Sequence, residues 1–406
     1  MEFKQTQIGK IPKDWGVFEL SQIGGIITGT TPSTKVEEYW GKGYPFVTPT
    51  DYSGEKYVYE TERTVTKHGA EKARLIPKDS IMVVCIASVG EVAMASIECI
   101  TNQQINTIVC NQETDQHYVY YAMAFSKNRL KRWAGITTSP IIKKSLFEKF
   151  PLPLPPLSEQ KKIAEILSTV DQGIEKVDEA IKKTQRLKNG LMQELLTKGI
   201  GHKEFKETEV GRIPKEWEVT IIKEIGEVIT GTTPSTKVKE YWGKGYPFIT
   251  PTDFSNSKYV HKTQRSVTRE GFKEARLIPK DSVLVTCIAS IGEVSMASSD
   301  CITNQQINSI VCKGGINPHY IYYTMTFRKG ILRRWAGVTT SPIIKKSFFE
   351  QFPIPLPPTI EQQEIAEILN TVDKRLELLR NRKERLERTK KGLMNDLLAG
   401  RVRVKG

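Results

Sequence analysis

The sequence predicts an α+β protein in which two globular α/β domains are separated by two long antiparallel α-helices that form a coiled coil, within a pseudo-two-fold internal duplication. Three observations predict this fold class. Three cysteines recur as three others with one constant shift, β-rich runs fill the first part of each copy, and a heptad pattern fills the second part.

The duplication covers nearly the whole chain. Cys85, Cys99 and Cys110 recur 202 positions later as Cys287, Cys301 and Cys312. With the same shift, residues 8–197 pair with residues 210–399 without a gap, and the runs TGTTPST, EYWGKGYPF and TNQQIN each find a partner. A period of 202 is far longer than the ~20–50 residues of solenoid repeats. The pattern therefore indicates one domain-sized module written twice.

Each copy begins with a part that mixes short strands and turns. Runs such as IMVVCIASVG and INTIVC have the length and composition of strands, and segments marked by Pro and Gly separate them. A proline cluster lies at the end of this part, at 150–157 and again at 352–358. Closely spaced prolines favour extended backbone and forbid helix, so we expect no helix within either cluster. We expect the two globular domains to span residues 1–157 and 203–359.

A heptad pattern follows each proline cluster. We expect a first long helix within 158–202 and a second, with a tail, within 360–406. Each helix leads away from its own globular part, so antiparallel pairing within the chain is the symmetric solution. Two alternatives are that each helix packs on its own domain, or that helices pair between chains. The seam residues are Ile163, Leu167, Val170, Ile174, Val177, Leu191, Leu195, Ile365, Leu369, Val372, Leu376, Leu379, Leu393 and Leu397.

Composition and charge narrow the class of protein. The 406 residues carry 60 Lys and Arg against 46 Asp and Glu, a formal charge of +14, and 38% of them are hydrophobic. These values exclude disordered and fibrous classes, and no apolar run reaches the ~18 residues of a membrane-spanning helix. The start, MEFKQTQIGK, has no apolar stretch typical of a signal peptide, so we expect a cytoplasmic protein. The positive charge favours a polyanionic partner, although solubility alone would also account for it.

Familiar catalytic motifs do not occur in the sequence. It contains no GxGxxG, GxxxxGK[ST], HExxH or GxSxG, and no cysteine lies in a CxxC pair. The cysteines lie in apolar runs, as expected for small buried hydrophobes. Of the five histidines, only His117 and His319 match across the repeat, and we interpret them as packing residues at a helix start. We expect no bound cofactor, metal or catalytic centre.

Polar residues recur in both copies in runs that suit DNA readout. Asn and Gln can pair with adenine, Thr and Ser with base edges or phosphate, and Lys with guanine or phosphate. Each residue could equally be satisfying the backbone of a turn. The candidates are Thr30, Thr31, Ser33, Lys35, Thr48, Thr50, Asp51, Asn102, Gln103, Gln104, Asn106, Thr138, Ser139, Lys143 and Lys144, and their counterparts Thr232, Thr233, Ser235, Lys237, Thr250, Thr252, Asp253, Asn304, Gln305, Gln306, Asn308, Thr340, Ser341, Lys345 and Lys346.

These motifs resemble those of the specificity subunits of type I restriction-modification enzymes. The resemblance is carried by VTPTD, RLIPKDS, TNQQIN, LPPLSEQKKIAEIL and LKNGLMQELL, each of which has an identical or similar counterpart in the second copy. It implies that each target recognition domain reads one half of a bipartite double-stranded DNA sequence, while the paired helices act as a ruler and dock two modification (methyltransferase) subunits. It also implies restriction subunits as partners, no membrane association, no S-adenosylmethionine and no catalysis in this chain. The rival interpretation is a DNA-acting nuclease or methyltransferase with unrecognised catalytic residues.

The two copies are nearly alike in sequence but unequal in charge. Near-identical recognition domains related by a two-fold axis should read nearly the same half-site in inverted orientation, which predicts an interrupted near-palindrome with half-sites of three to four bases. Residues 1–202 carry 26 Lys and Arg against 23 Asp and Glu, whereas residues 203–406 carry 34 against 23. Much of the excess lies on the second predicted helix. It could be a solvated helix face or a contact with spacer phosphates or an acidic partner.

Overall fold

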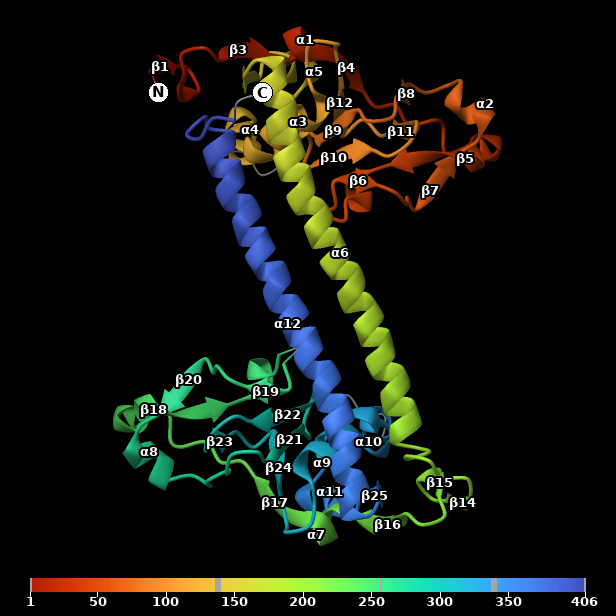
Figure 1. The fold of residues 1–406 in the computed structure, drawn as a ribbon, viewed down its shortest axis with the longest axis vertical. Coiled ribbons are helices and arrows are strands. Elements are labelled where there is room, and N and C mark those ends of the chain that lie inside the picture. Colours follow the sequence, from red (N-terminus) through yellow and green to blue (C-terminus); the bar gives the residue numbers. More distant parts are fainter. Residues whose placement is uncertain (1, 136–139, 256, 337–341, 405–406) are drawn as a thin grey trace. The chain divides into compact units, whose positions relative to one another are not determined.

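The computed structural model describes residues 2–135, 140–255, 257–336 and 342–404 (Figure 1). The chain divides into two compact units. Unit 1 comprises Met1–Lys176 with Lys383–Gly406, and unit 2 comprises Val177–Arg382. Each unit therefore contains one globular domain and a part of both long helices.

Two sheets form most of the globular domain of unit 1. The larger sheet has five strands in the order β4 (Gly24–Thr28), β12 (Ile105–Cys110), β9 (Ile81–Val84), β10 (Val92–Ala95) and β6 (Tyr57–Val58). The smaller sheet has the order β7 (Arg63–Val65), β5 (Trp40–Val47), β11 (Cys99–Thr101) and β8 (Leu75–Ile76). Two further strand pairs are β1 (Phe3–Thr6) with β2 (Gly9–Pro12), and β3 (Gly16–Glu19) with β13 (Pro151–Leu154). The proline cluster thus contains an extended strand, as the sequence predicts.

Short helices pack against the two sheets and complete the core of unit 1. They are α1 (Leu20–Ile23), α2 (Lys67–Ala70), α3 (Gln116–Phe125), α4 (Lys127–Trp133) and α5 (Lys144–Phe147). The main core cluster combines the large buried rings of Trp15, Tyr118 and Phe150 with residues of the sheet. A separate apolar cluster, which includes Val47, Met82 and Ile105, lies where the two sheets meet.

Unit 2 repeats this arrangement element by element. Its larger sheet has the order β17 (Gly226–Thr230), β24 (Ile307–Cys312), β21 (Val283–Thr286), β22 (Val294–Ala297) and β19 (Tyr259–Val260). The smaller sheet has the order β20 (Arg265–Val267), β18 (Trp242–Ile249) and β23 (Ile302–Thr303), with a single bridge at Ile278 where unit 1 has a fourth strand. The remaining elements are β14 (Phe205–Thr208), β15 (Gly211–Pro214), β16 (Glu218–Ile221), β25 (Pro353–Leu356), α7 (Ile222–Ile225), α8 (Arg269–Lys273), α9 (Pro318–Phe327), α10 (Lys329–Trp335) and α11 (Lys346–Phe349).

The long helices are α6 (Leu157–Leu195) and α12 (Thr359–Leu397), each of 39 residues. Within unit 1, the direction of pairing follows from two contacts: Glu159 meets Arg403, and Asp171 forms an ion pair of 2.6 Å with Lys390. Since residue numbers rise from 159 to 171 along α6 while those of their partners fall from 403 to 390, α6 and α12 are antiparallel. Every predicted seam residue is buried or half-buried. Within unit 2, Lys188 and Asp373 form the equivalent ion pair, also at 2.6 Å.

The helix ends also enter the globular cores, which the heptad pattern does not reveal. In unit 1, Ile163 and Leu167 from the start of α6 join Leu397 and Leu398 in the core that contains Trp15. In unit 2, the start of α12 and the end of α6 enter the core in the same way. The predicted seam and the alternative of packing on the domain thus coexist along one helix.

A charged clasp closes the end of unit 1. Glu159 accepts hydrogen bonds from the Trp15 indole at 3.2 Å and from Arg403 Nε at 2.7 Å, and Arg403 also donates to Asp14 at 2.8 Å. In unit 2, Glu361 accepts from the Trp217 indole at 2.9 Å and contacts His202. The glutamate of the SEQ and IEQ runs is therefore a structural acceptor in both units.

Candidate nucleic-acid interface

The glycine-containing loop after β4 lies against the TNQQIN segment. Thr30 N donates to Thr101 O at 2.8 Å, and Gly29 N donates to Ile105 O at 3.0 Å. A Cβ atom built on Gly29 would lie 2.0 Å from Asn102 O, so only glycine allows this approach. The two motifs are about seventy residues apart in the chain yet share one backbone network.

The VTPTD turn joins the same edge. β5 and β11 pair in parallel, and Asn102 N donates to Val47 O at 3.2 Å at the point where both strands end. The turn is held by Asp51, whose Oδ2 accepts from Thr48 N at 2.7 Å and whose Oδ1 accepts from Glu62 N at 2.9 Å. The carboxylate is therefore occupied by backbone amides.

A fourth motif reaches the edge through the end of β9. Cys85 N donates to Gln104 O at 2.7 Å, and Cys85 O accepts from Ile142 N at 2.8 Å. This places the segment from Pro140 to the exposed Lys143 and Lys144 beside TNQQIN. The predicted site residues Thr138, Ser139, Thr340 and Ser341 lie outside the residues that the structure describes.

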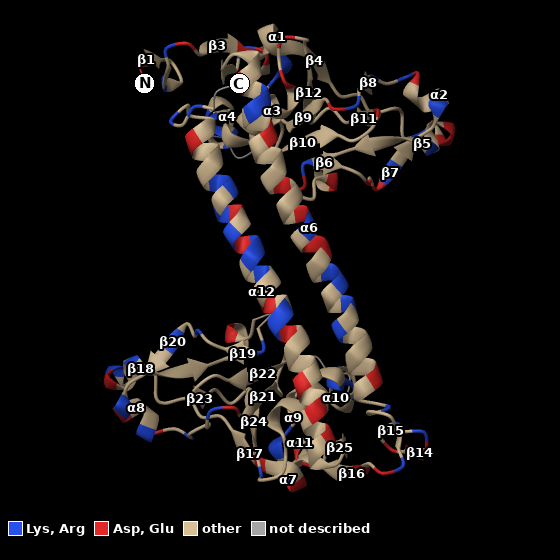
Figure 2. Cartoon of the chain, in the orientation of Figure 1, with Lys and Arg blue, Asp and Glu red and all other residues tan. Residues whose placement is uncertain are grey.

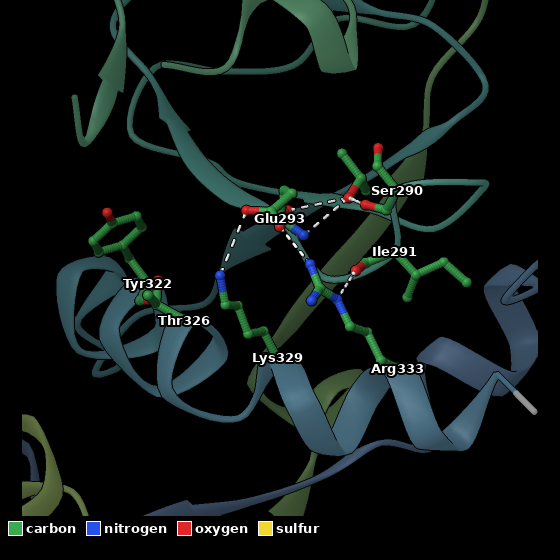
Figure 3. A network of polar contacts seen from close by, with 8 residues as sticks. Ser290, Ile291, Glu293, Tyr322, Thr326, Lys329 and Arg333 are labelled. Carbon is green, nitrogen blue, oxygen red and sulfur yellow. Dashed lines mark hydrogen bonds and ion pairs between the residues drawn. The ribbon is translucent and has the colours of Figure 1, made fainter. Parts of the chain in front are cut away.

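Backbone strain marks the loop between β9 and β10. Ala87 has a φ of +63°, and Ala289 at the same place in unit 2 has +60°, a conformation that alanine rarely adopts. In unit 2, the loop is held to α10 by Glu293, which contacts Lys329 at 3.7 Å and Arg333 at 2.5 Å, while Arg333 Nε donates to Ile291 O at 2.8 Å (Figure 3). Strained residues persist where the surroundings over-determine them, often at functional sites.

The polar side chains at this edge differ in their surroundings. Thr31 Oγ1 donates to Gln103 Oε1 at 2.6 Å, and Asn102 Nδ2 donates to Gln104 Oε1 at 2.9 Å. Gln103, Ser33, Lys35 and Thr50 are exposed, while the other predicted residues of the loop, the VTPTD turn and Asn102 and Gln104 are half-buried. We define the recognition edge of each unit as the glycine loop, the VTPTD turn, the exposed part of TNQQIN and the lysine pair.

Asn106 and Asn308 do not belong to this surface, which corrects their assignment as DNA contacts. They are 3% and 2% exposed. Asn106 Oδ1 accepts from Thr28 Oγ1 at 2.6 Å, and Asn308 makes the same bond to Thr230 at 2.7 Å. They fall on the inward face of β12 and β24, where a polar side chain must find a partner inside the protein. The run TNQQIN therefore combines exposed and half-buried amides with a structural one.

Two arginines at the edge were not among the predicted site residues. The Arg63 guanidinium lies 3.5 Å from the centre of the Trp40 ring, and Arg74 Nη1 donates to Thr28 O at 2.8 Å. They recur as Arg265 over Trp242 and as Arg276 bonded to Thr230 O. Recurrence at the 202-residue shift was the available signal: Arg63 lies in the polar run ETERT, and Arg74 opens the RLIPKDS motif.

The recognition edge of unit 2 has the same geometry. Thr233 bonds to Gln305 at 2.7 Å, Asn304 bonds to Gln306 at 2.8 Å, and Asp253 holds the Thr250 turn. Lys345 and Lys346 are exposed, as their counterparts are. Four motifs that are scattered in sequence thus converge twice, once in each unit.

The cysteines and histidines are packed as the sequence predicts. Burial raises the pKa of the Cys85 and Cys99 thiols to about 12, so both stay protonated and are poor nucleophiles at neutral pH. Burial also lowers the pKa of His117 and His319, which lie near the starts of α3 and α9. Among the residues that the structure describes, no group of three His, Cys, Asp or Glu could hold a metal ion.

A family model describes most of the chain. The "Type I restriction modification DNA specificity domain" matches residues 12–184 and again residues 214–388. The chain belongs to this family. It is a specificity subunit, the non-catalytic chain of a type I restriction-modification system that determines which DNA target is recognised. The family and the non-catalytic role that the motifs implied are confirmed, and the rival interpretation as a DNA-acting enzyme is not supported.

Relatives extend along the full length of this specificity subunit. It is 28% identical over 422 residues to the type I restriction enzyme MjaVIII specificity subunit of Methanocaldococcus jannaschii, covering 99% of this chain and 96% of that one. It is 31% identical over 179 residues to the EcoR124I/EcoR124II specificity subunit of Escherichia coli, which covers 42% of each chain.

Solved structures share the fold. The S subunit from M. genitalium superposes with a TM-score of 0.64 at 14% identity, covering 97% of both chains. A chain from work on complex assembly and conformational transition of the type I R-M system gives a TM-score of 0.57 at 16% identity, covering 97% of this chain and 99% of that one. The predicted fold class, two α/β domains with two long helices packed together, is therefore confirmed. Within the described residues, no helix is both long and apolar enough to cross a membrane.

Proposed function

We propose that each recognition edge reads one half of a bipartite double-stranded DNA target. The observation that supports this is the twofold convergence of the glycine loop, the VTPTD turn, TNQQIN and the lysine pair. Amide side chains can bond to two adjacent atoms of adenine, and lysines bind phosphate without regard to sequence. Gln103 and Gln305 would read bases, while Lys35, Lys143 and their counterparts would hold the backbone.

The arginines extend this proposal. A guanidinium that is stacked on an indole loses little freedom on binding, because its plane is already fixed, and its N–H groups can pair with guanine or phosphate. Arg63 and Arg265 are the stacked pair. We assign them to the recognition edges beside the amides.

The two edges carry nearly the same side chains, which predicts an interrupted near-palindrome with half-sites of three to four bases. The chain would act in the cytoplasm as part of a type I restriction-modification complex. The helices α6 and α12 would set the length of the spacer, the DNA between the two half-sites, and would dock two modification subunits. Restriction subunits would complete the complex. The functional division would follow residues 1–157 and 203–359 as recognition domains, and 158–202 and 360–406 as helical segments.

The decisive experiment is to reconstitute the chain with its modification subunits and to map methylated positions on genomic DNA. Gln103→Ala should relax specificity in one half-site, and Gln305→Ala in the other. The exposed Gln7→Ala, in the turn between β1 and β2 and outside the motifs of both edges, serves as the control. If Gln103→Ala and Gln305→Ala left the methylated sequence unchanged, the assignment of the recognition edges would be wrong.

A further inference from the structure

Unit 2 contains a polar groove outside its recognition edge. It has a volume of about 730 Å³ and lies between the segment around β19 and one face of α12. Lys258, Tyr259 and His261 line one side, and Asn370, Lys374 and Arg380 line the other. Figure 2 shows the charges that α12 carries along this stretch.

Lys258 forms the base of the groove. Its ammonium lies 4.8 Å from the centre of the Tyr323 ring and 5.2 Å from that of Tyr322, and it donates to Asn370 Oδ1. Burial lowers the pKa of Lys258 to about 8, and the neighbouring cations Lys188 and Lys374 add to the lowering. An anion in the groove would stabilise the charged form of this lysine.

The equivalent place in unit 1 has the opposite charge. Subtracting 202 replaces Ser257 by Glu55 and Lys374 by Gln172, while Asp171 and Glu175 keep the two acids of unit 2. Electrostatic effects show that these groups are neighbours in unit 1. The pKa of Tyr59 is raised by burial and then by Glu175 and Glu55.

Lys56 in unit 1 and its counterpart Lys258 in unit 2 have neighbours that differ in charge in the same way. Burial lowers the pKa of Lys56; three carboxylates, led by Asp171, oppose the lowering, and one cation, Lys390, adds to it. Lys258 has two carboxylates and two cations around it. The lysine is thus common to both units, and its surroundings are more acidic in unit 1 than in unit 2.

The size and charge of the groove decide the class of ligand. The three cations Lys258, Lys374 and Arg380 outnumber the two carboxylates of the same lining, Asp373 and Glu377, which leaves a net positive charge on one concave surface that attracts phosphate. DNA is the polyanion that this family recognises, and Lys and Arg contacts to its phosphates supply affinity without sequence readout. The corresponding acids of unit 1 would repel the same group.

We propose that the groove of unit 2 binds a backbone phosphate of the target DNA, and that its counterpart in unit 1 does not. The inference rests on the proposed function, because it takes DNA bound at the recognition edges as given. Two half-sites of similar sequence would then be held with unequal strength. The charge difference between the halves of the chain would thus produce a difference in affinity for the two half-sites.

The test exchanges the grooves by paired substitutions in the complex assembled with modification subunits. The double variant Ser257→Glu/Lys374→Gln gives the groove of unit 2 two of the side chains of unit 1, and Glu55→Ser/Gln172→Lys does the reverse. Binding to a target duplex is measured over a range of salt concentrations. We expect the first variant to lower affinity about tenfold at low salt and to reduce the slope of log Kd against log salt by about 1, since one lost phosphate contact removes about 0.9. The second should not reduce the slope.

Each contrary outcome has a distinct meaning. An unchanged slope in the first variant, or an equal reduction in both, would overturn the groove inference. If subunit assembly, followed by sedimentation, weakened while the slope stayed constant, the groove would bind a protein partner and the inference would be wrong. The proposed function is checked separately, by the preference of the wild-type complex for its target over an unrelated duplex. If the wild-type complex shows no preference for its target, the proposed function of the recognition edges is wrong. If it shows the preference but the salt slopes of the variants are unaltered, only the groove inference is wrong.

Discussion

Single residues of one motif have different roles, and the sequence could not separate them. Gln103 and Asn106 both lie in TNQQIN, but Gln103 is exposed whereas Asn106 is 3% exposed and bonded to Thr28. Alternation along a strand predicts that one neighbour faces inward, yet both side chains are amides, so chemistry alone does not show which one reads DNA. Asp51 is a similar case, because its carboxylate holds a turn.

This division of roles predicts opposite effects of two substitutions. Asn106→Ala should lower the free energy of unfolding by about 1–3 kcal/mol, because the Thr28 hydroxyl loses its acceptor. Gln103→Ala should change stability by less than about 0.5 kcal/mol, as exposed substitutions usually do, while altering the methylated sequence. Chemical denaturation and methylation mapping on the same two proteins provide the measurements. Equal destabilisation by both changes would contradict the assignment.

Lys258 should titrate unusually for a lysine. Its pKa of about 8 lies below the ordinary value near 10.5, so the folded protein holds fewer protons than the unfolded chain between these values. The free energy of unfolding should therefore gain a contribution that rises with pH from about 8 to 10.5, and Lys258→Met should lack this rise. Competitive amine labelling against pH gives the apparent pKa directly. An apparent pKa at the ordinary value would show that the burial is relieved in solution.

At the scale of elements, the long helices were the most predictable part. Heptad spacing located both helices, because a helix that pairs with another in a coiled coil repeats apolar residues about every 3.5 positions. The same spacing could not show that the helix ends enter the globular cores, since core and seam both require buried apolar residues. Heptad spacing also places Lys188 and Lys390 on the seam, where apolar residues are expected, and does not explain why lysines stand there. The structure pairs each with an aspartate of the other helix at 2.6 Å.

The ion pair of Lys390 with Asp171 should contribute to the stability of unit 1. Lys390→Met leaves the carboxylate, which is 11% exposed, with the Tyr121 hydroxyl as its hydrogen-bond donor. We expect a loss of about 1–2 kcal/mol, below the range for fully buried pairs because the lysine is 27% exposed. The neighbouring Lys391→Met is the matched control and should have little effect. Thermal unfolding that shifted equally for both variants would argue against the pair.

At the scale of the whole molecule, the period of 202 residues was enough to predict two equivalent domains. What it could not predict was the charge difference between the two grooves. In sequence, the replacement of Gln172 in the first copy by Lys374 in the second is one of many differences between the two long helices. Only the fold shows that this position lies opposite Lys258, across a groove, rather than in open solvent.

The helices should set the spacing of the two half-sites. Each helix of 39 residues rises about 58 Å, and one heptad accounts for about 10 Å, or about 3 base pairs at ~3.4 Å each. Deleting one heptad from both helices together should therefore shorten the spacer of the methylated sequence, whereas deletion from one alone should disrupt assembly because the seams lose register. An unchanged spacer after the paired deletion would refute the ruler role.

The division into units has a consequence for how the chain folds during synthesis. Unit 2 is one continuous stretch, Val177–Arg382, so it leaves the ribosome complete. Unit 1 needs Lys383–Gly406, and its clasp needs Arg403 to reach Asp14 and Glu159. The domain that is synthesised first must therefore wait for residues made much later, and its exposed core surface is the part of the nascent protein most in need of protection from aggregation.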